Sequence, residues 1–420
     1  MQHHSFLSRL SGPAICCYNI MKISVVFFLL LLIIPESTVH AQNLDWVNLN
    51  NEARSLYQSG QYEEAIVLVK EALEIAQKEW GNDHPNVAQT LNNLGLLYQG
   101  QGEYAQAEPV YKRSLAIWEE TLGPDSPTVA RGMNNLGELY RAEGQYAKAE
   151  ALHKRSLAIW EKTLGGDHVD VAASLNNLAL LFKIQGQYTQ AEPLYQRSLA
   201  IWEKSAGPDH PDVAVGLNNL AGLYYAQAHY SKAEPLYKRS LSILEKALGA
   251  DHPDVAKGLN NLAELYTAEG YFTLAKPLFK RALAISEKAL GPYHPDVATT
   301  LNNLGHLYYA QGNYVVAKPF FERSLAIWEK TVGPDHPHVA LSLNNLAALY
   351  QAQDQYSEAE PLFIRSLAIL ENALGRKHPR VIMSLHNVAD FYRKSGREIE
   401  AVAMDKRASL ESSGASQPNP

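Results

Sequence analysis

The residues best suited to acid–base chemistry or metal binding are Asp-His pairs that recur along the chain. An imidazole beside a carboxylate can act as an acid–base dyad or as part of a metal site. An enzyme has no use for many copies of one dyad, whereas Asp and His between helices can cap helix ends. We therefore interpret the pairs as helix caps and predict no metal site. The pairs are Asp83-His84, Asp167-His168, Asp209-His210, Asp251-His252 and Asp335-His336.

Other catalytic patterns are also missing from the sequence. It contains no glycine-rich phosphate loop, no Gly-x-Ser-x-Gly and no His-Glu-x-x-His motif. Both cysteines, Cys16 and Cys17, lie before a long apolar run near the N-terminus. We therefore predict that the protein is not an enzyme and needs no cofactor.

A second polar pattern is the dipeptide Asn-Asn, whose first members are residues 92, 134, 176, 218, 260, 302 and 344. Each amide side chain has donors and an acceptor. If the pairs stack as a ladder, they can hold an extended peptide through its backbone with little regard for its sequence. The alternative is that the amides hydrogen-bond between neighbouring helices and fix their stacking. Both roles can coexist.

Positions that vary between the repeats share the helix face of these amides and would give specificity. They include the bases Arg131, Arg141, Lys183 and Lys257 and the aromatics Tyr225 and Tyr309. This set suits a peptide with acidic and aromatic side chains. Glu138 and Glu264 on the same face weaken a simple basic patch, and the alternative is a solvated face of mixed charge.

The elements that position these residues repeat every 42 residues. In one unit, Val87, Leu91, Leu94 and Tyr98 recur at helical spacing and end at Gln101-Gly102, which predicts a helix and a turn. A second helix is predicted over residues 104–122, followed by a linker with two prolines over residues 123–127. Nine such units span residues 44–410.

The repeated residues resemble a known family. The pattern Leu94-Gly95, Tyr98, Gly102, Tyr104, Ala107 and Tyr111 resembles the tetratricopeptide repeat. Units of 42 residues with "LNNLA" and "AEPLYKRSLAI" phrases are similar to the repeats of kinesin light chain. The heptad coiled coil that joins that family to its motor is missing, so we expect a non-motor relative.

The resemblance implies an all-α fold, a right-handed α-solenoid of about nine helix-turn-helix repeats. It also implies that the concave groove binds a peptide through the second asparagine of each pair. Those residues are Asn93, Asn135, Asn177, Asn219, Asn261, Asn303 and Asn345. We therefore expect a non-catalytic scaffold that binds an extended peptide or protein segment. The alternative is an architectural protein that self-associates and uses the ladder only for structure.

The N-terminus predicts an export signal. Lys22 precedes a twelve-residue apolar run over residues 23–34, and a Val-x-Ala sequence ends at Ala41. This pattern is typical of a signal peptide, and the run is too short for a membrane-spanning helix. We predict cleavage after Ala41 and a secreted or periplasmic protein without stable membrane insertion. Residues 1–20 precede Met21 and are interpreted as a misassigned upstream start.

The charge of the chain limits the classes of partner that it can bind. The formal net charge is −7 and no long run of Lys or Arg occurs. Nucleic acids and anionic membranes require a basic surface, so we expect a protein or peptide partner. We predict a solenoid over residues 42–410 and a disordered tail over residues 411–420, which are polar and contain Gly and Pro.

Overall fold

The computed structural model describes residues 41–413. Within this range 84% of the residues are helical, no strand occurs, and eighteen helices form a solenoid of repeating pairs. The all-α repeat fold predicted from the sequence is therefore confirmed. The signal-peptide prediction falls on residues outside this range, apart from Ala41. None of the helices in the range is both long and apolar enough to cross a membrane.

The first helix of each repeat is termed an A helix and the second a B helix. The A helices are α3 (Ala41–Gln58), α5 (Pro85–Gly100), α7 (Pro127–Ala142), α9 (Val169–Ile184), α11 (Pro211–Ala226), α13 (Pro253–Ala268), α15 (Pro295–Ala310), α17 (Pro337–Gln351) and α19 (Pro379–Lys394). The B helices are α4 (Tyr62–Trp80), α6 (Tyr104–Leu122), α8 (Tyr146–Leu164), α10 (Tyr188–Ala206), α12 (Tyr230–Leu248), α14 (Phe272–Leu290), α16 (Tyr314–Val332), α18 (Tyr356–Leu374) and α20 (Glu398–Ser413). Helix α20 thus extends three residues beyond the predicted end of the solenoid.

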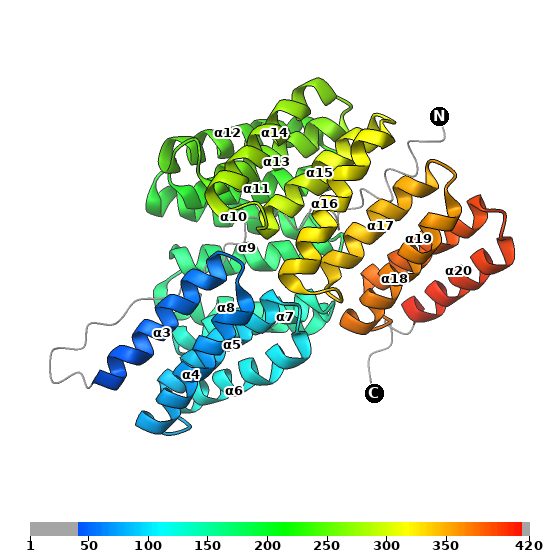
Figure 1. The fold of residues 1–420 in the computed structure, drawn as a ribbon. Helices are drawn as coiled ribbons and strands as arrows, with labels where there is room; N and C mark the ends of the chain where they lie inside the picture. The colour runs from blue at the N-terminus through cyan, green and yellow to red at the C-terminus, as the bar shows by residue number, and fades with distance from the viewer. Residues whose placement is uncertain (1–40, 414–420) are drawn as a thin grey trace. The chain divides into compact units, whose positions relative to one another are not determined.

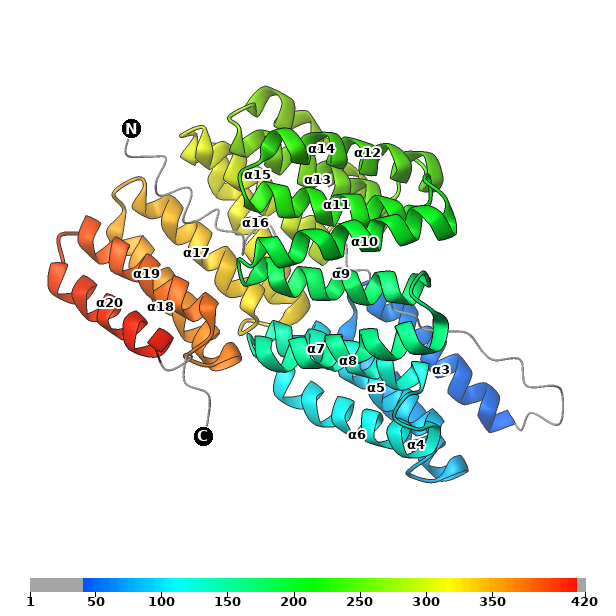
Figure 2. The same ribbon diagram turned by 180° about the vertical axis from the view of Figure 1, so that it is seen from behind.

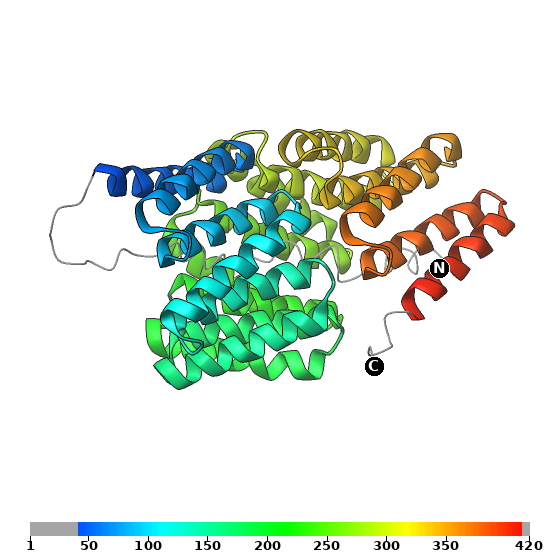
Figure 3. The same cartoon turned by 90° about the horizontal axis from the view of Figure 1, so that it is seen from below.

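The chain divides into two compact units, one up to Leu265 and the other from Tyr266. In the first unit, helices that follow one another from α3 to α11 pack side by side (Figures 1 and 2). In the second unit the same holds from α14 to α20, and Figure 3 shows α19 and α20 in orange and red next to each other.

The two helices of a repeat approach closely because a small residue of the A helix faces an aromatic ring of the B helix. A Cβ atom added to Gly95 would lie only 2.7 Å from the ring of Tyr111, which is buried. The hydroxyl of Ser114 donates a hydrogen bond of 2.6 Å to the carbonyl of Ala88 in the same pair. This bond recurs in Ser156–Ala130, Ser198–Ala172, Ser240–Ala214, Ser324–Ala298 and Ser366–Ala340.

The histidines of the Asp-His pairs cap the A helices, as predicted. Nδ1 of His84 accepts a hydrogen bond from the backbone N–H of Asn86 at 3.1 Å, and Pro85 occupies the first helical position. Ser126 provides the equivalent acceptor for α7 through its hydroxyl. The other capping histidines are His168, His210, His252, His294, His336 and His378.

The aspartates of these pairs have a different role. Asp167 accepts a hydrogen bond from Lys204, and Asp209 accepts one from Lys246. Each of these bonds joins a linker to the B helix of the next repeat. Tyr293 replaces the aspartate in one linker, and there the ammonium of Lys330 lies 3.8 Å from the centre of the tyrosine ring.

We predict that the His84 cap makes folding sensitive to acid. Burial lowers the pKa of His84, so the folded state favours the neutral ring, whose Nδ1 can accept a hydrogen bond. The stability from this cap is present above the ordinary histidine pKa of about 6.5 and is lost as pH falls through the lowered pKa. At pH 7.5, His84→Ala should destabilise the protein by about 1 kcal/mol.

The matched variant is His84→Ser, which supplies the acceptor found at Ser126. It should be more stable than His84→Ala and should lose less stability than the wild type between pH 7.5 and pH 5. Urea unfolding at both pH values measures the difference. Equal midpoints for the two variants at pH 7.5 would show that the side-chain acceptor contributes nothing.

Candidate functional site

The asparagine pairs form a ladder between neighbouring A helices. Nδ2 of Asn93 donates to Oδ1 of Asn50 at 2.8 Å, so the second asparagine of one repeat binds the first asparagine of the repeat before it. The same bond joins Asn135 to Asn92, Asn219 to Asn176, Asn261 to Asn218, Asn345 to Asn302 and Asn387 to Asn344, at 2.7–3.1 Å. In these pairs the amides fix the stacking of the A helices.

Burial of the ladder limits what it can offer to a ligand. Asn93 is 3% exposed, and its Oδ1 accepts a hydrogen bond from Gln89 at 3.0 Å. Asn219, Asn261 and Asn345 are buried in the same way. Asn303 is also buried, and its Nδ2 has no hydrogen-bond partner within the described residues of the second unit.

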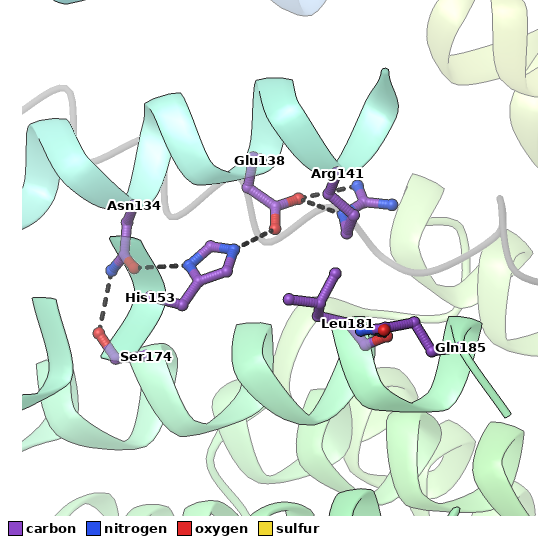
Figure 4. A network of polar contacts seen from close by, with 7 residues as sticks. All are labelled: Asn134, Glu138, Arg141, His153, Ser174, Leu181 and Gln185. Carbon is purple, nitrogen blue, oxygen red and sulfur yellow. Dashed lines mark hydrogen bonds and ion pairs between the residues drawn. The ribbon is translucent and has the colours of Figure 1, made fainter. Parts of the chain in front are cut away.

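The ladder is rewired between α7 and α9 (Figure 4). Nδ2 of Asn134 donates to the hydroxyl of Ser174 at 2.9 Å, and its Oδ1 lies 3.0 Å from Nδ1 of His153. His153 is fully buried at the position that Tyr111 occupies in the preceding repeat. Asn177, which would otherwise bind Asn134, is half-buried and makes no side-chain hydrogen bond within residues 41–413.

Glu138 completes this network. Its Oε1 lies 3.4 Å from Nε2 of His153, and its Oε2 accepts two hydrogen bonds from Arg141, at 2.8 and 3.0 Å (Figure 4). Burial alone would raise the pKa of Glu138, but the Arg141 guanidinium and the His153 ring outweigh it and lower that pKa to about 2. The carboxylate is therefore charged at neutral pH, and Arg141 is committed to it.

The other predicted bases differ in their surroundings. Lys257 pairs with Asp254 at 3.1 Å along its own helix. Arg131 is half-buried in the electrostatic field of Asp170, and burial lowers the pKa of Arg131. Lys183 is only 3% exposed and its side chain has no hydrogen bond or ion pair among the residues described.

Both predicted aromatics are half-buried, and each contacts another tyrosine ring across the turn that follows the A helix, with the two ring planes tilted. The ring centres of Tyr225 and Tyr230 are 5.7 Å apart, in the first unit. In the second unit, those of Tyr309 and Tyr314 are 5.3 Å apart, and the rings of His306 and Tyr309 stack with their centres 6.4 Å apart. Burial raises the pKa of the Tyr309 hydroxyl.

Two features of this surface were not predicted. In six rungs of the ladder the first asparagine of a pair is the acceptor, and the recurrence of that residue was the signal for this role. His153 was missed because it replaces an aromatic core residue, and only comparison with Tyr111 and Tyr195 reveals the change. In the part of the chain that the structure describes, no group of three or more His, Cys, Asp or Glu side chains could hold a metal ion.

Known proteins match the chain in sequence and in fold. The tetratricopeptide repeat profile matches residues 47–120, 87–162, 128–192, 170–246, 254–330, 301–371 and 338–409. No curated protein matches. Among solved structures, BtubC (BKLC) from P. vanneervenii is 26% identical and covers 58% of this chain and 92% of its own, with a TM-score of 0.44.

Two further solved structures extend the comparison. A kinesin-light-chain-type protein from Podosopora anserina with nearly identical TPR-like repeats is 30% identical, covering 49% of this chain and 98% of its own, with a TM-score of 0.41. A Rap protein complexed with competence and sporulation factor is 15% identical, covering 88% of this chain and 98% of its own. Its TM-score of 0.58 shows a shared fold.

We predict that Asn219 and Asn177 differ sharply in their contribution to stability. Asn219→Ala removes a buried interhelical hydrogen bond and leaves the Asn176 acceptor unpaired, which should cost about 1–3 kcal/mol. Asn177→Ala removes no hydrogen bond and should cost less than about 0.5 kcal/mol. Urea unfolding of the two variants tests this, and equal losses would contradict a structural ladder.

Proposed function

The chain belongs to the tetratricopeptide repeat family, and on that premise we propose that it is a non-catalytic scaffold that binds an extended peptide or protein segment. The binding surface is the exposed edge of the A helices, within a groove. Solenoids of this kind use such surfaces for binding. We further propose that the protein acts outside the cytoplasm, on the evidence of the predicted signal peptide.

The observation that carries this proposal is the contrast between two sets of A-helix positions. Positions such as Leu94 and Tyr98 are buried and nearly uniform between repeats. Positions three and six residues after the second asparagine, such as Leu96 and Gln99, vary in type and are mostly half-buried. Variation combined with access is what a specificity surface requires, since packing does not dictate these residues.

Most of the asparagine ladder does not contact the peptide directly in the proposed binding mode. Most of its amides are committed to interhelical bonds, so they position the A helices. The half-buried amide of Asn177 has both its donor and its acceptor available for a peptide backbone. The proposed surface in the first unit therefore centres on α9 and α11, where Lys183 and Tyr225 also lie.

The architectural alternative finds less support. In α6, Leu115 and Trp118 pack against Gly132 of the next repeat. At the two equivalent positions of α20 the chain has Ser409 and Ser412. Two serines in place of a leucine and a tryptophan remove the apolar contacts that stack one repeat on the next at these positions. This observation favours binding of a partner over self-association through α20.

We expect selection from a random-peptide phage library to yield peptides that bind the purified protein with micromolar or better affinity. A variant with Asn177→Ala and Tyr225→Ala should bind the same peptides at least about tenfold more weakly, because it removes the free amide and an aromatic contact. The matched control is Lys112→Ala with Lys154→Ala, which changes exposed residues of the B helices.

The control variant should bind as the wild type does, and circular dichroism should show all three proteins equally helical. No enrichment of peptides would contradict the scaffold proposal. Concentration-dependent sedimentation of the wild type without peptide binding would favour the architectural alternative.

A further inference from the structure

Near their starts, the B helices α14 and α16 expose an apolar residue at a position that is polar in every other B helix. Leu274 of α14 is 51% exposed, and Val316, its equivalent in α16, is 36% exposed. Tyr271 and Val315, which are near them in the sequence, are 53% and 80% exposed. The polar residues at this position in the other repeats are Glu64, Gln106, Lys148, Gln190, Lys232, Glu358 and Glu400.

The same two helices reverse a recurring charge. Two residues after the position of Leu274, five B helices carry a glutamate, namely Glu108, Glu150, Glu192, Glu234 and Glu360. The carboxylate of Glu192 accepts a hydrogen bond of 2.6 Å from the hydroxyl of Tyr224 in the next A helix, and the bonds at Glu108 and Glu360 are equivalent. In α14 and α16 this position is occupied by Lys276 and Lys318.

Contact with a neighbouring tyrosine does not explain these lysines. Nζ of Lys276 lies 5.4 Å from the ring centre of Tyr308, and Nζ of Lys318 lies 5.1 Å from that of Tyr350. In α8, however, Nζ of Lys148 lies 4.9 Å from the ring of the equivalent tyrosine, whose hydroxyl still donates to a glutamate. A lysine can therefore contact the ring from the position of Leu274 without loss of the glutamate.

The altered residues of the two repeats are connected through α15. Lys276 of α14 contacts the ring of Tyr308, and that ring stacks on Phe320 of α16 with the ring centres 5.6 Å apart. Phe320 follows Val316 by four residues, so the two are neighbours on one helix face. We define the α14–α16 patch as Tyr271, Leu274, Val315 and Val316 together with Lys276 and Lys318.

We propose that the α14–α16 patch is a second protein-binding surface, which takes a segment whose apolar side chains are flanked by acidic ones. The apolar side chains cover Leu274 and Val316, and a carboxylate pairs with Lys276, which has no ion pair among the described residues. Nζ of Lys318 lies 3.7 Å from a carboxylate oxygen of Glu322. Clustered exposed apolar residues mark interaction sites, and complementary charge at their border selects the partner.

This surface goes beyond the binding function proposed above. It lies on B helices of the second unit, whereas the proposed peptide surface centres on A helices of the first unit. An anionic bilayer matches the patch less well than a protein does, because lipid-binding segments gather about four to eight basic residues.

The other repeats supply the replacements for a test. Leu274→Gln with Val316→Gln introduces the residue that α6 and α10 have at this position, and Lys276→Glu with Lys318→Glu restores the recurring glutamate. Both double variants should fold as the wild type does. The glutamate variant should have an equal or higher thermal unfolding midpoint, because its carboxylates accept hydrogen bonds from the tyrosine hydroxyls. A lower midpoint would show that the lysines serve the fold and would overturn their role in binding.

Binding is tested with a random-peptide phage library panned on the full protein. An excess of the glutamine variant in solution removes peptides that bind elsewhere. The enriched peptides should contain apolar residues beside Asp or Glu and should bind both double variants at least about tenfold more weakly than the wild type, measured by fluorescence anisotropy. Affinity should be unchanged in the matched control, Lys148→Gln with Lys232→Gln, which alters the same helix position in the first unit.

The variant with Asn177→Ala and Tyr225→Ala should also bind these peptides as the wild type does, so failure of this proposal and failure of the A-helix surface are distinguishable. An absence of enriched peptides, or equal affinity for the wild type and the glutamate variant, would overturn the proposal.

Two further results would assign the patch to another occupant and overturn the proposal as well. A wild-type dimer in sedimentation that the glutamine variant no longer forms would assign the patch to a second copy of the chain. Binding of the wild type to phosphatidylglycerol vesicles that the glutamate variant loses would assign it to a lipid surface.

Discussion

The close approach of the A and B helices is the constraint on which the rest of the structure depends. The position of Gly95 is Gly or Ala in every repeat, which brings a helix backbone against a buried ring, and at Gly95 even a Cβ atom would lie 2.7 Å from the ring of Tyr111. With that spacing set, the serine of each B helix reaches a carbonyl of its partner helix, and the A helices come near enough for their amides to bond. Dense packing and directional hydrogen bonds thus reinforce one another in every repeat.

Polar side chains in this fold mostly serve the junctions between repeats. Amides join A helices, aspartates in the linkers bind lysines of the next B helix, and arginines of the B helices pair with glutamates one repeat earlier, as Arg197 does with Glu161 at 2.7 Å. The polar atoms of these side chains therefore already have hydrogen-bond or ion-pair partners within the chain. A binding surface therefore has to be sought at positions where the repeating pattern is interrupted, and Asn177 and Lys183 are two such positions.

The sequence predicted the fold well because its signals are local and repeated. Helical periodicity, turn residues and small residues at fixed spacing are sufficient to define each pair, and nearly identical repeats act as an internal alignment. The sequence could not show that the amide of Asn219 donates a hydrogen bond to Asn176. A polar helix face has the same sequence pattern whether it is in contact with solvent or with a neighbouring helix. It also could not distinguish the paired cation Arg141 from the unpaired Lys183, because that difference depends on side chains from other helices.

The rewired rung at Asn134 has a consequence for how the chain finds its native arrangement. Because the repeats are nearly identical, a helix pair can dock onto the wrong neighbour during folding and still form most of the native contacts. Such docking is a recognised route to misassembly in repeat proteins. The set formed by His153, Asn134 and Ser174 fits together only when α7, α8 and α9 are the true neighbours. A buried polar mismatch would accompany any slip by one repeat at this point. One irregular junction thus favours the correct order of docking between helix pairs in an otherwise periodic chain.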